Sequence, residues 1–118
     1  MTASRAPRDP RRGSWPSAAS EVVAVIGDPV EHSLSPLLHN TAFAELGLDW
    51  VSVGFRVPAG SAPTALEGAR ALGLAGLSVT MPHKAAVAEA VDDRTEIAQR
   101  LGAVNCVRIE KGLSLIHI

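Results

Sequence analysis

Two short segments place hydroxyl or amine side chains at the predicted start of a helix. In the first, GDPVEHSLSP at 27–36, Ser33 and Ser35 stand two residues apart, so their hydroxyls face one side of an extended loop. A helix that starts at Pro36, with Ser35 as its N-cap, adds free N–H groups and a partial positive charge, and together these suit a carboxylate. A plainer alternative remains open, in which Ser35 only caps the helix and Ser33 only contacts water.

The second segment, SVTMPHK at 78–84, carries a candidate acid–base group. Pro82 is expected to start a helix, which puts Lys84 in its first turn, where a cation opposes the helix dipole at a cost of roughly 0.3–1 kcal/mol. Local inconsistencies of this type cluster at functional sites. The same field favours the neutral amine that a general base needs. A solvated lysine lying along the helix start is the alternative that the segment leaves open.

Asn105 is a further candidate, because it is an amide within an apolar strand pattern at 103–109. A buried asparagine needs partners, and backbone groups or a ligand hydroxyl would serve equally well. Cys106 is expected to be a small core residue of the same strand. The lone cysteine and four histidines show no spacing such as CxxC or HExxH, so we expect no metal site.

The elements that would position these groups alternate strand and helix, which predicts a three-layer α/β/α fold with a mostly parallel sheet. Ligands of such sheets bind beyond the carboxyl ends of the strands, where both segments lie. Strands are expected at 22–26, 50–55, 74–81 and 103–109, and helices at 36–46, 63–72, 82–91 and after a capping box at 93–96. Gly47, Gly73 and Gly102 are the expected helix stops. Apolar spacing predicts that the helices bury Leu38, Ala42, Leu46, Leu66, Ala69, Leu72, Ile97 and Leu101.

The composition of the 118 residues, 47% hydrophobic and 19% charged, predicts one packed soluble domain. A net charge of −1 argues against a nucleic-acid or anionic-membrane partner, and no apolar stretch approaches the roughly 18 residues of a membrane span. A single cysteine fits the reducing cytoplasm. Residues 1–20, rich in arginine and proline, are expected to be a disordered tail or the product of a misplaced start codon, in preference to a transit peptide.

Three segments, 27–40, 76–84 and 102–105, resemble the signature motifs of the shikimate dehydrogenase family in order and spacing. The resemblance spans Val22 to about Glu110 and implies the substrate-binding domain of that family, which a nucleotide-binding Rossmann domain follows. The family reduces 3-dehydroshikimate to shikimate with NADPH, on the route to chorismate and the aromatic amino acids. The resemblance also implies that the complete enzyme is a monomer or a homodimer.

The resemblance gives each polar residue of the motifs a role. Ser33 and Ser35 would hold the carboxylate of shikimate, and Lys84 would be the catalytic acid/base. Thr80, Lys84 and Asn105 would contact the ring hydroxyls. Ser78 stands where many members carry asparagine and would be a further substrate contact, because serine keeps a hydrogen-bonding group.

Two features of the family have no counterpart in the chain. The family continues through a hairpin into Gly-x-Asn-Thr-Asp, whose aspartate pairs with the lysine, whereas residues 111–118 read KGLSLIHI. No GxGxxG phosphate turn appears, so NADP would be bound by a C-terminal domain outside the chain. We therefore expect a substrate-binding domain at 21–110, an atypical end at 111–118 from truncation or a misassembled reading frame, and no dehydrogenase activity of the chain alone.

Two other functions stay open. One is a stand-alone module that binds a hydroxylated cyclic carboxylate without chemistry. The other is a fragment of a quinate-preferring dehydrogenase, although the two serines at 33 and 35 favour shikimate.

Overall fold

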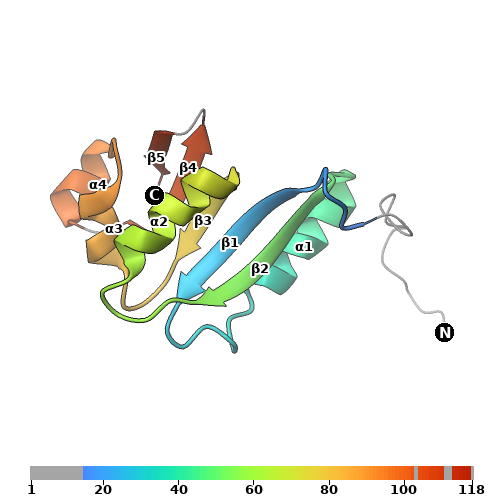
Figure 1. Cartoon of the computed structure of the whole chain (residues 1–118), viewed down its shortest axis with the longest axis horizontal. Helices are drawn as coiled ribbons and strands as arrows, with labels where there is room; N and C mark the ends of the chain where they lie inside the picture. The colour runs from blue at the N-terminus through green and yellow to red at the C-terminus, as the bar shows by residue number, and fades with distance from the viewer. Residues whose placement is uncertain (1–14, 103, 111–112, 118) are drawn as a thin grey trace.

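One mixed sheet forms the centre of the molecule, and four of its five strands run in the same direction (Figure 1). The computed structural model describes residues 15–102, 104–110 and 113–117. In spatial order the strands are β2 (Trp50–Arg56), β1 (Glu21–Gly27), β3 (Gly76–Val79), β4 (Cys106–Glu110) and β5 (Leu113–His117). β1 is parallel to β2 and β3, whereas β4 is antiparallel to both β3 and β5. The predicted α/β fold with a mostly parallel sheet is confirmed, and β4 is its reversed strand.

Helices cover the sheet on both faces, which gives the three predicted layers. They are α1 (Ser35–Leu46), α2 (Ala62–Leu72), α3 (Lys84–Ala90) and α4 (Glu96–Leu101). Ala24 and Ile26 of β1 point into a core shared with α2, α3 and α4, whereas Val23 lies on the opposite face, beside α1. The apolar run of β1 is therefore buried from both sides, as fully apolar strands of parallel sheets are.

The reversal of β4 follows from the two short helices that precede it. α3 leads the chain away from the carboxyl end of β3, and α4 leads it back. The N–H of Val104 donates to the carbonyl of Lys84 at 3.0 Å, so the chain re-enters beside the start of α3. β4 can then only run opposite to β3. Asn105, the residue before β4, consequently lies at the edge where β1 and β3 end.

The prediction that α1 buries Leu38, Ala42 and Leu46 is wrong. Leu38 and Leu46 are 65% and 70% exposed, and Ala42 is exposed as well. α1 instead turns to β2 a face that carries both aromatic and polar side chains. Because β2 is an edge strand, its outer backbone groups have no strand partner. The amide of Asn40 replaces that partner: its Nδ2 donates to the Ser52 carbonyl at 3.0 Å, and its Oδ1 accepts from the Ser52 N–H at 2.8 Å.

The other helices follow the predicted pattern only in part. α2 buries Leu66 and Ala69 as predicted but leaves Leu72 78% exposed at its last turn. In α4 the predicted core residues Ile97 and Leu101 are exposed, and the small Ala98 faces the core. The three predicted glycine stops are confirmed, with φ between 64° and 71° at Gly47, Gly73 and Gly102.

The predicted capping box at 93–96 is displaced. Thr95 is the N-cap of α4, and its hydroxyl accepts a hydrogen bond from the N–H of Ala98 at 3.1 Å. Threonine serves here because its oxygen reaches the N3 position of the helix that starts one residue later. The helix therefore begins at Glu96, which places its acidic side chain in the first turn.

Both ends of the chain are only partly described. Residues 1–14 of the predicted tail lie outside the described residues, but Trp15 Nε1 donates to the Trp50 carbonyl at 3.1 Å and the Ser20 hydroxyl donates to Asp49 at 2.7 Å. At the other end, Leu113–His117 pairs with β4 as β5, whereas residues 111, 112 and 118 are outside the described part. Within the described ranges no helix is long and apolar enough to cross a membrane.

Candidate functional site

The ends of β1 and β3 are joined through the backbone at the carboxyl edge of the sheet. The Thr80 N–H donates to the Ile26 carbonyl at 3.0 Å, and the Asp28 N–H donates to the Met81 carbonyl at 3.1 Å. β3 ends at Val79, earlier than predicted, so Thr80 and Met81 already belong to the loop. Thr80 is half-buried there and stands beside the last residues of β1.

Asn105, the residue before β4, joins the same edge. Its carbonyl accepts a hydrogen bond from the Val79 N–H at 2.8 Å, and its neighbour Val104 is bonded to the carbonyl of Lys84. The structure thus brings together the chain segments that carry Thr80, Lys84 and Asn105. The expectation that Asn105 is buried is wrong: the residue is exposed, because it lies before β4 and not inside the strand. Its amide is thereby available to a ligand.

Lys84 is the first residue of α3, so its predicted place in the first turn is confirmed. Pro82, however, does not start the helix. It lies in a turn in which the His83 N–H donates to the Thr80 carbonyl at 3.0 Å, and His83 is the N-cap residue. Lys84 is half-buried, and its ammonium makes no ion pair within the described residues. The amine is therefore free to serve a bound ligand.

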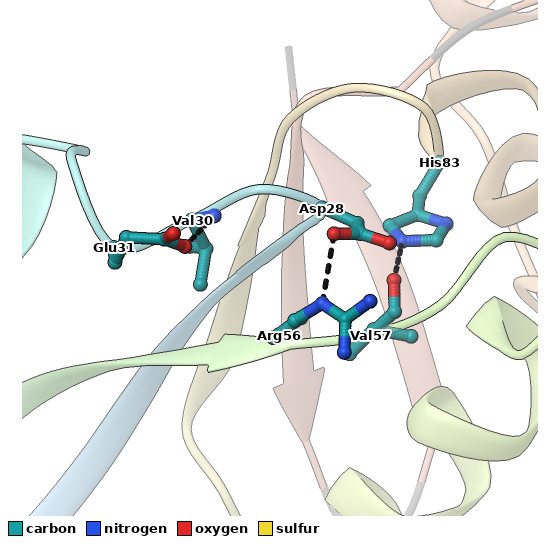
Figure 2. A network of polar contacts seen from close by, with 6 residues as sticks. All are labelled: Asp28, Val30, Glu31, Arg56, Val57 and His83. Atoms are coloured by element: carbon teal, nitrogen blue, oxygen red, sulfur yellow. Dashed lines mark hydrogen bonds and ion pairs between the residues drawn. The ribbon is translucent and has the colours of Figure 1, made fainter.

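His83 anchors this turn. Nothing in the sequence indicated this structural role beyond the place of His83 between proline and lysine. The side chain is 1% exposed, and its Nε2 lies 2.5 Å from the carbonyl oxygen of Val57, just after β2 (Figure 2). Since a carbonyl can only accept, Nε2 carries the proton. His83 thus ties the start of α3, and with it Lys84, to the end of β2.

Ser33 and Ser35 lie together at the start of α1 and are linked to each other. The Ser35 N–H donates to Ser33 Oγ at 3.2 Å. The prediction that Ser35 is the N-cap is wrong: the helix begins one residue earlier, at Ser35, with Leu34 as its N-cap, because the Leu38 N–H bonds to the Leu34 carbonyl. The Ser33 hydroxyl keeps its own proton to donate, and the Ser35 hydroxyl has no partner within the described residues.

Ser78 lies inside β3 and opens onto the face that α1 covers. It lines a groove of about 410 Å³ together with Phe43, Cys106 and residues from the beginnings of β1 and β2. The groove is mainly apolar and extends toward the amino ends of the parallel strands, away from Lys84. The prediction that Cys106 is a core residue is wrong, because the residue is exposed. Its thiol is nevertheless partly buried, and this burial raises the pKa of the thiol.

The acidic groups next to the site are already engaged. Asp28 Oδ1 accepts from Arg56 Nε at 2.9 Å, which joins the ends of β1 and β2 (Figure 2). The carboxylate of Glu31 accepts backbone hydrogen bonds, first from its own N–H and then from Val30, and these hold the pKa of Glu31 below its usual value. Among the described residues no three His, Cys, Asp or Glu side chains gather as a metal site would require.

Comparison with known proteins identifies the family. The family model described as the shikimate dehydrogenase substrate binding domain matches residues 25–107. The chain belongs to this family. A curated relative, the shikimate dehydrogenase (NADP(+)) of Methanopyrus kandleri, is 52% identical over 95 residues, which cover 80% of this chain and 33% of that protein. The chain thus spans about a third of the length of the curated relatives that it matches.

Solved structures agree with the family assignment. A shikimate 5-dehydrogenase from Listeria monocytogenes, in complex with shikimate and NAD, superposes with a TM-score of 0.83 at 38% identity and covers 86% of this chain and 35% of that one. A 5-ketofructose reductase of a Gluconobacter strain, in its ligand-free form, reaches 0.81 at 30% identity over 86% of this chain and 36% of its own. The substrate-binding fold therefore occurs in enzymes named for different substrates.

Proposed function

We propose that this chain is the substrate-binding part of an NADP-dependent shikimate dehydrogenase, which reduces 3-dehydroshikimate to shikimate. The observation that carries the proposal is the convergence of Thr80, Lys84 and Asn105 at one edge, through hydrogen bonds of their own segments. Family membership supports the same substrate. A half-buried Lys84 with no ion pair within the described residues supports acid–base chemistry over the alternative of a binding module without chemistry.

The two ends of the substrate are recognised by different chemistry. The hydroxyls of Ser33 and Ser35 donate to the carboxylate, assisted by the partial positive charge at the start of α1. Thr80, Lys84 and Asn105 contact the ring hydroxyls, and Ser78 is a further substrate contact.

Lys84 exchanges a proton with the oxygen at the carbon that is reduced or oxidised. A half-buried amine at hydrogen-bonding distance contributes typically about 10²–10⁴-fold to such a step.

The nucleotide does not fit the residues of this chain. The sequence has no glycine-rich GxGxxG turn, which is the usual cradle for the pyrophosphate of a dinucleotide. NADP is therefore assigned to the part of the enzyme that lies beyond the matched third of the relatives. What this chain supplies is substrate recognition and a proton.

Titration of the purified 118-residue chain with shikimate tests the proposal. We expect saturable binding by calorimetry, with amide shift changes in nuclear magnetic resonance (NMR) spectra at 33–35, 80–84 and 105. Quinate, the methyl ester of shikimate and 5-ketofructose serve as comparison ligands. Since shikimate and quinate carry a carboxylate and the other two ligands do not, shikimate should bind more tightly than the ester and the sugar. Equal affinity for all ligands, or no binding of shikimate, would overturn the proposal.

A further inference from the structure

Gly27, the last residue of β1, is packed against the side chain of Thr80. A Cβ atom at Gly27 would lie 2.3 Å from Thr80 Cγ2, 3.2 Å from the Met81 carbonyl oxygen and 3.5 Å from that of Pro29. Contacts below 3.0 Å are essentially never made by real Cβ atoms. Gly27 is not among the glycines with a positive φ, so its backbone conformation is open to any residue. It is the space at position 27, and not the backbone, that requires glycine.

The missing side chain leaves a slot that the methyl group of Thr80 fills. A threonine carries three substituents on Cβ in staggered positions, and its χ1 angle is stiff because Cβ is branched. With Cγ2 held in the slot, the direction of Oγ1 is also set. The Thr80 hydroxyl makes no hydrogen bond within the described residues, so nothing else there holds it.

Rotation of Thr80 cannot relieve a clash at position 27 without cost to the hydroxyl. Two of the three staggered positions would put Cγ2 or Oγ1 into the slot, and an added Cβ excludes both. Only the rotamer with the hydrogen in the slot remains. Because the order of substituents around Cβ is fixed by chirality, that rotation moves the methyl group to the place that the hydroxyl had.

We propose that Gly27 is a positioning residue for the substrate, acting through Thr80: the slot at Gly27 selects the Thr80 rotamer that presents Oγ1 to a ring hydroxyl. The inference rests on the proposed function, since it needs Thr80 to contact shikimate. It adds a residue that does not itself touch the ligand.

The test compares shikimate affinity among variants of the 118-residue chain. In Gly27→Ala the methyl group of Thr80 takes the place of the Thr80 hydroxyl beside the ligand, so we expect shikimate to bind roughly tenfold more weakly. Gly54→Ala is the matched control, because a Cβ there would meet Val30 Cγ2 at an ordinary 3.5 Å. Both glycine-to-alanine substitutions lower the entropy of the unfolded chain alike, so comparison with the control isolates the effect of the steric clash at position 27. We expect it to bind as the unmodified chain does.

Thr80→Ser separates positioning from a general packing defect. Serine keeps the hydroxyl and has no Cγ2, so it can place a hydrogen in the slot and still point Oγ to the ligand. Gly27→Ala should therefore cost little further affinity in the Thr80→Ser background, a coupling that a double-mutant cycle measures. Equal losses in both backgrounds, or unchanged affinity of the single Gly27→Ala variant, would overturn the inference.

Two measurements keep the test decisive. If Gly27→Ala does not fold, heteronuclear couplings of the Thr80 methyl in the unmodified chain report χ1 directly, and averaging among rotamers contradicts the inference. If the unmodified chain fails to bind shikimate while Thr80 shows one rotamer, the proposed function fails and the steric role of Gly27 stands. The two failures are thus distinguishable.

Discussion

Replacing Ser33 and Ser35 one at a time should have different consequences, because the two hydroxyls have different partners. Ser33 Oγ accepts from the Ser35 N–H at 3.2 Å and so satisfies one backbone donor at the start of α1. The Ser35 hydroxyl makes no hydrogen bond within the described residues. Ser33→Ala therefore removes a structural and a ligand contact, whereas Ser35→Ala removes a ligand contact alone.

The structure sets the expected magnitudes. A hydrogen bond to a backbone N–H contributes about 1 kcal/mol, so Ser33→Ala should lower the free energy of unfolding by that amount and the Tm by about 4–8 °C. Ser35→Ala should leave the free energy of unfolding within about 0.5 kcal/mol. A hydrogen bond to a charged group contributes about 1.5–3 kcal/mol, so each variant should bind shikimate at least roughly tenfold more weakly.

Thermal melts and calorimetric titrations of the same samples provide the assay. Shikimate and its methyl ester are titrated in parallel, because only the acid presents a charged acceptor. Thr41→Ala is the control on α1, since the Thr41 hydroxyl bonds only to the Leu37 carbonyl of its own helix and the residue is exposed. Equal losses for acid and ester, or a Tm drop in Ser35→Ala as large as in Ser33→Ala, would refute the reasoning.

Three further changes test the surroundings of the site. In a chimera that joins residues 21–110 to the unmatched remainder of the Methanopyrus kandleri relative, Lys84→Ala should lower kcat by about 10²–10⁴-fold with a small change in KM; a kcat within threefold would make Lys84 a solvated residue. Glu31→Gln should destabilise the chain above pH 4.5, the usual pKa, because the depressed pKa of the folded carboxyl stabilises the fold there; urea unfolding at several pH values should show this difference vanish as the pH falls well below 4.5. His83→Phe leaves the Val57 carbonyl without its donor and should cost about 1–3 kcal/mol in the free energy of unfolding, whereas the exposed His32→Phe should stay within about 0.5 kcal/mol.

Sequence patterns predicted best the features that depend on local chemistry. The β-branched run at 22–26 could only be a strand buried on both faces, and the glycine after each of three helices ended it as expected. Lys84 also fell in the first turn of α3, as the neighbouring Pro82 indicated, even though the helix starts after the turn that contains the proline. These features need no knowledge of what packs where.

Features that depend on distant partners were beyond the sequence. Apolar spacing favoured Leu38 and Leu46 as the inner face of α1, but the edge strand β2 required hydrogen-bond partners, and Asn40 supplies them. Periodicity likewise carries no strand direction, so the reversal of β4, which moves Asn105 to the site, had no signal. The space at Gly27 depends on Thr80, more than fifty residues away, and appears only when the two strands are paired.

The charges around the site are arranged so that Lys84 stays available. A carboxylate beside an ammonium would pair with it strongly in a partly dry site, and the loop after β1 carries two acidic side chains. Asp28 is instead paired with Arg56, and Glu31 is held by backbone N–H groups.

If Arg56 is replaced by alanine, the Asp28 carboxylate loses its counter-charge at the same edge of the sheet. The carboxylate of shikimate would then meet an uncompensated negative charge, so Arg56→Ala should weaken shikimate binding more than binding of the neutral ester, and Asp28→Asn in the same background should restore it. The Asp28 backbone N–H, which bonds to Met81, is kept in both variants, so Asp28→Asn changes only the charge of the side chain and leaves this backbone contact in place. Calorimetry with acid and ester decides the point, and a loss that Asp28→Asn does not restore would show that Arg56 acts through packing.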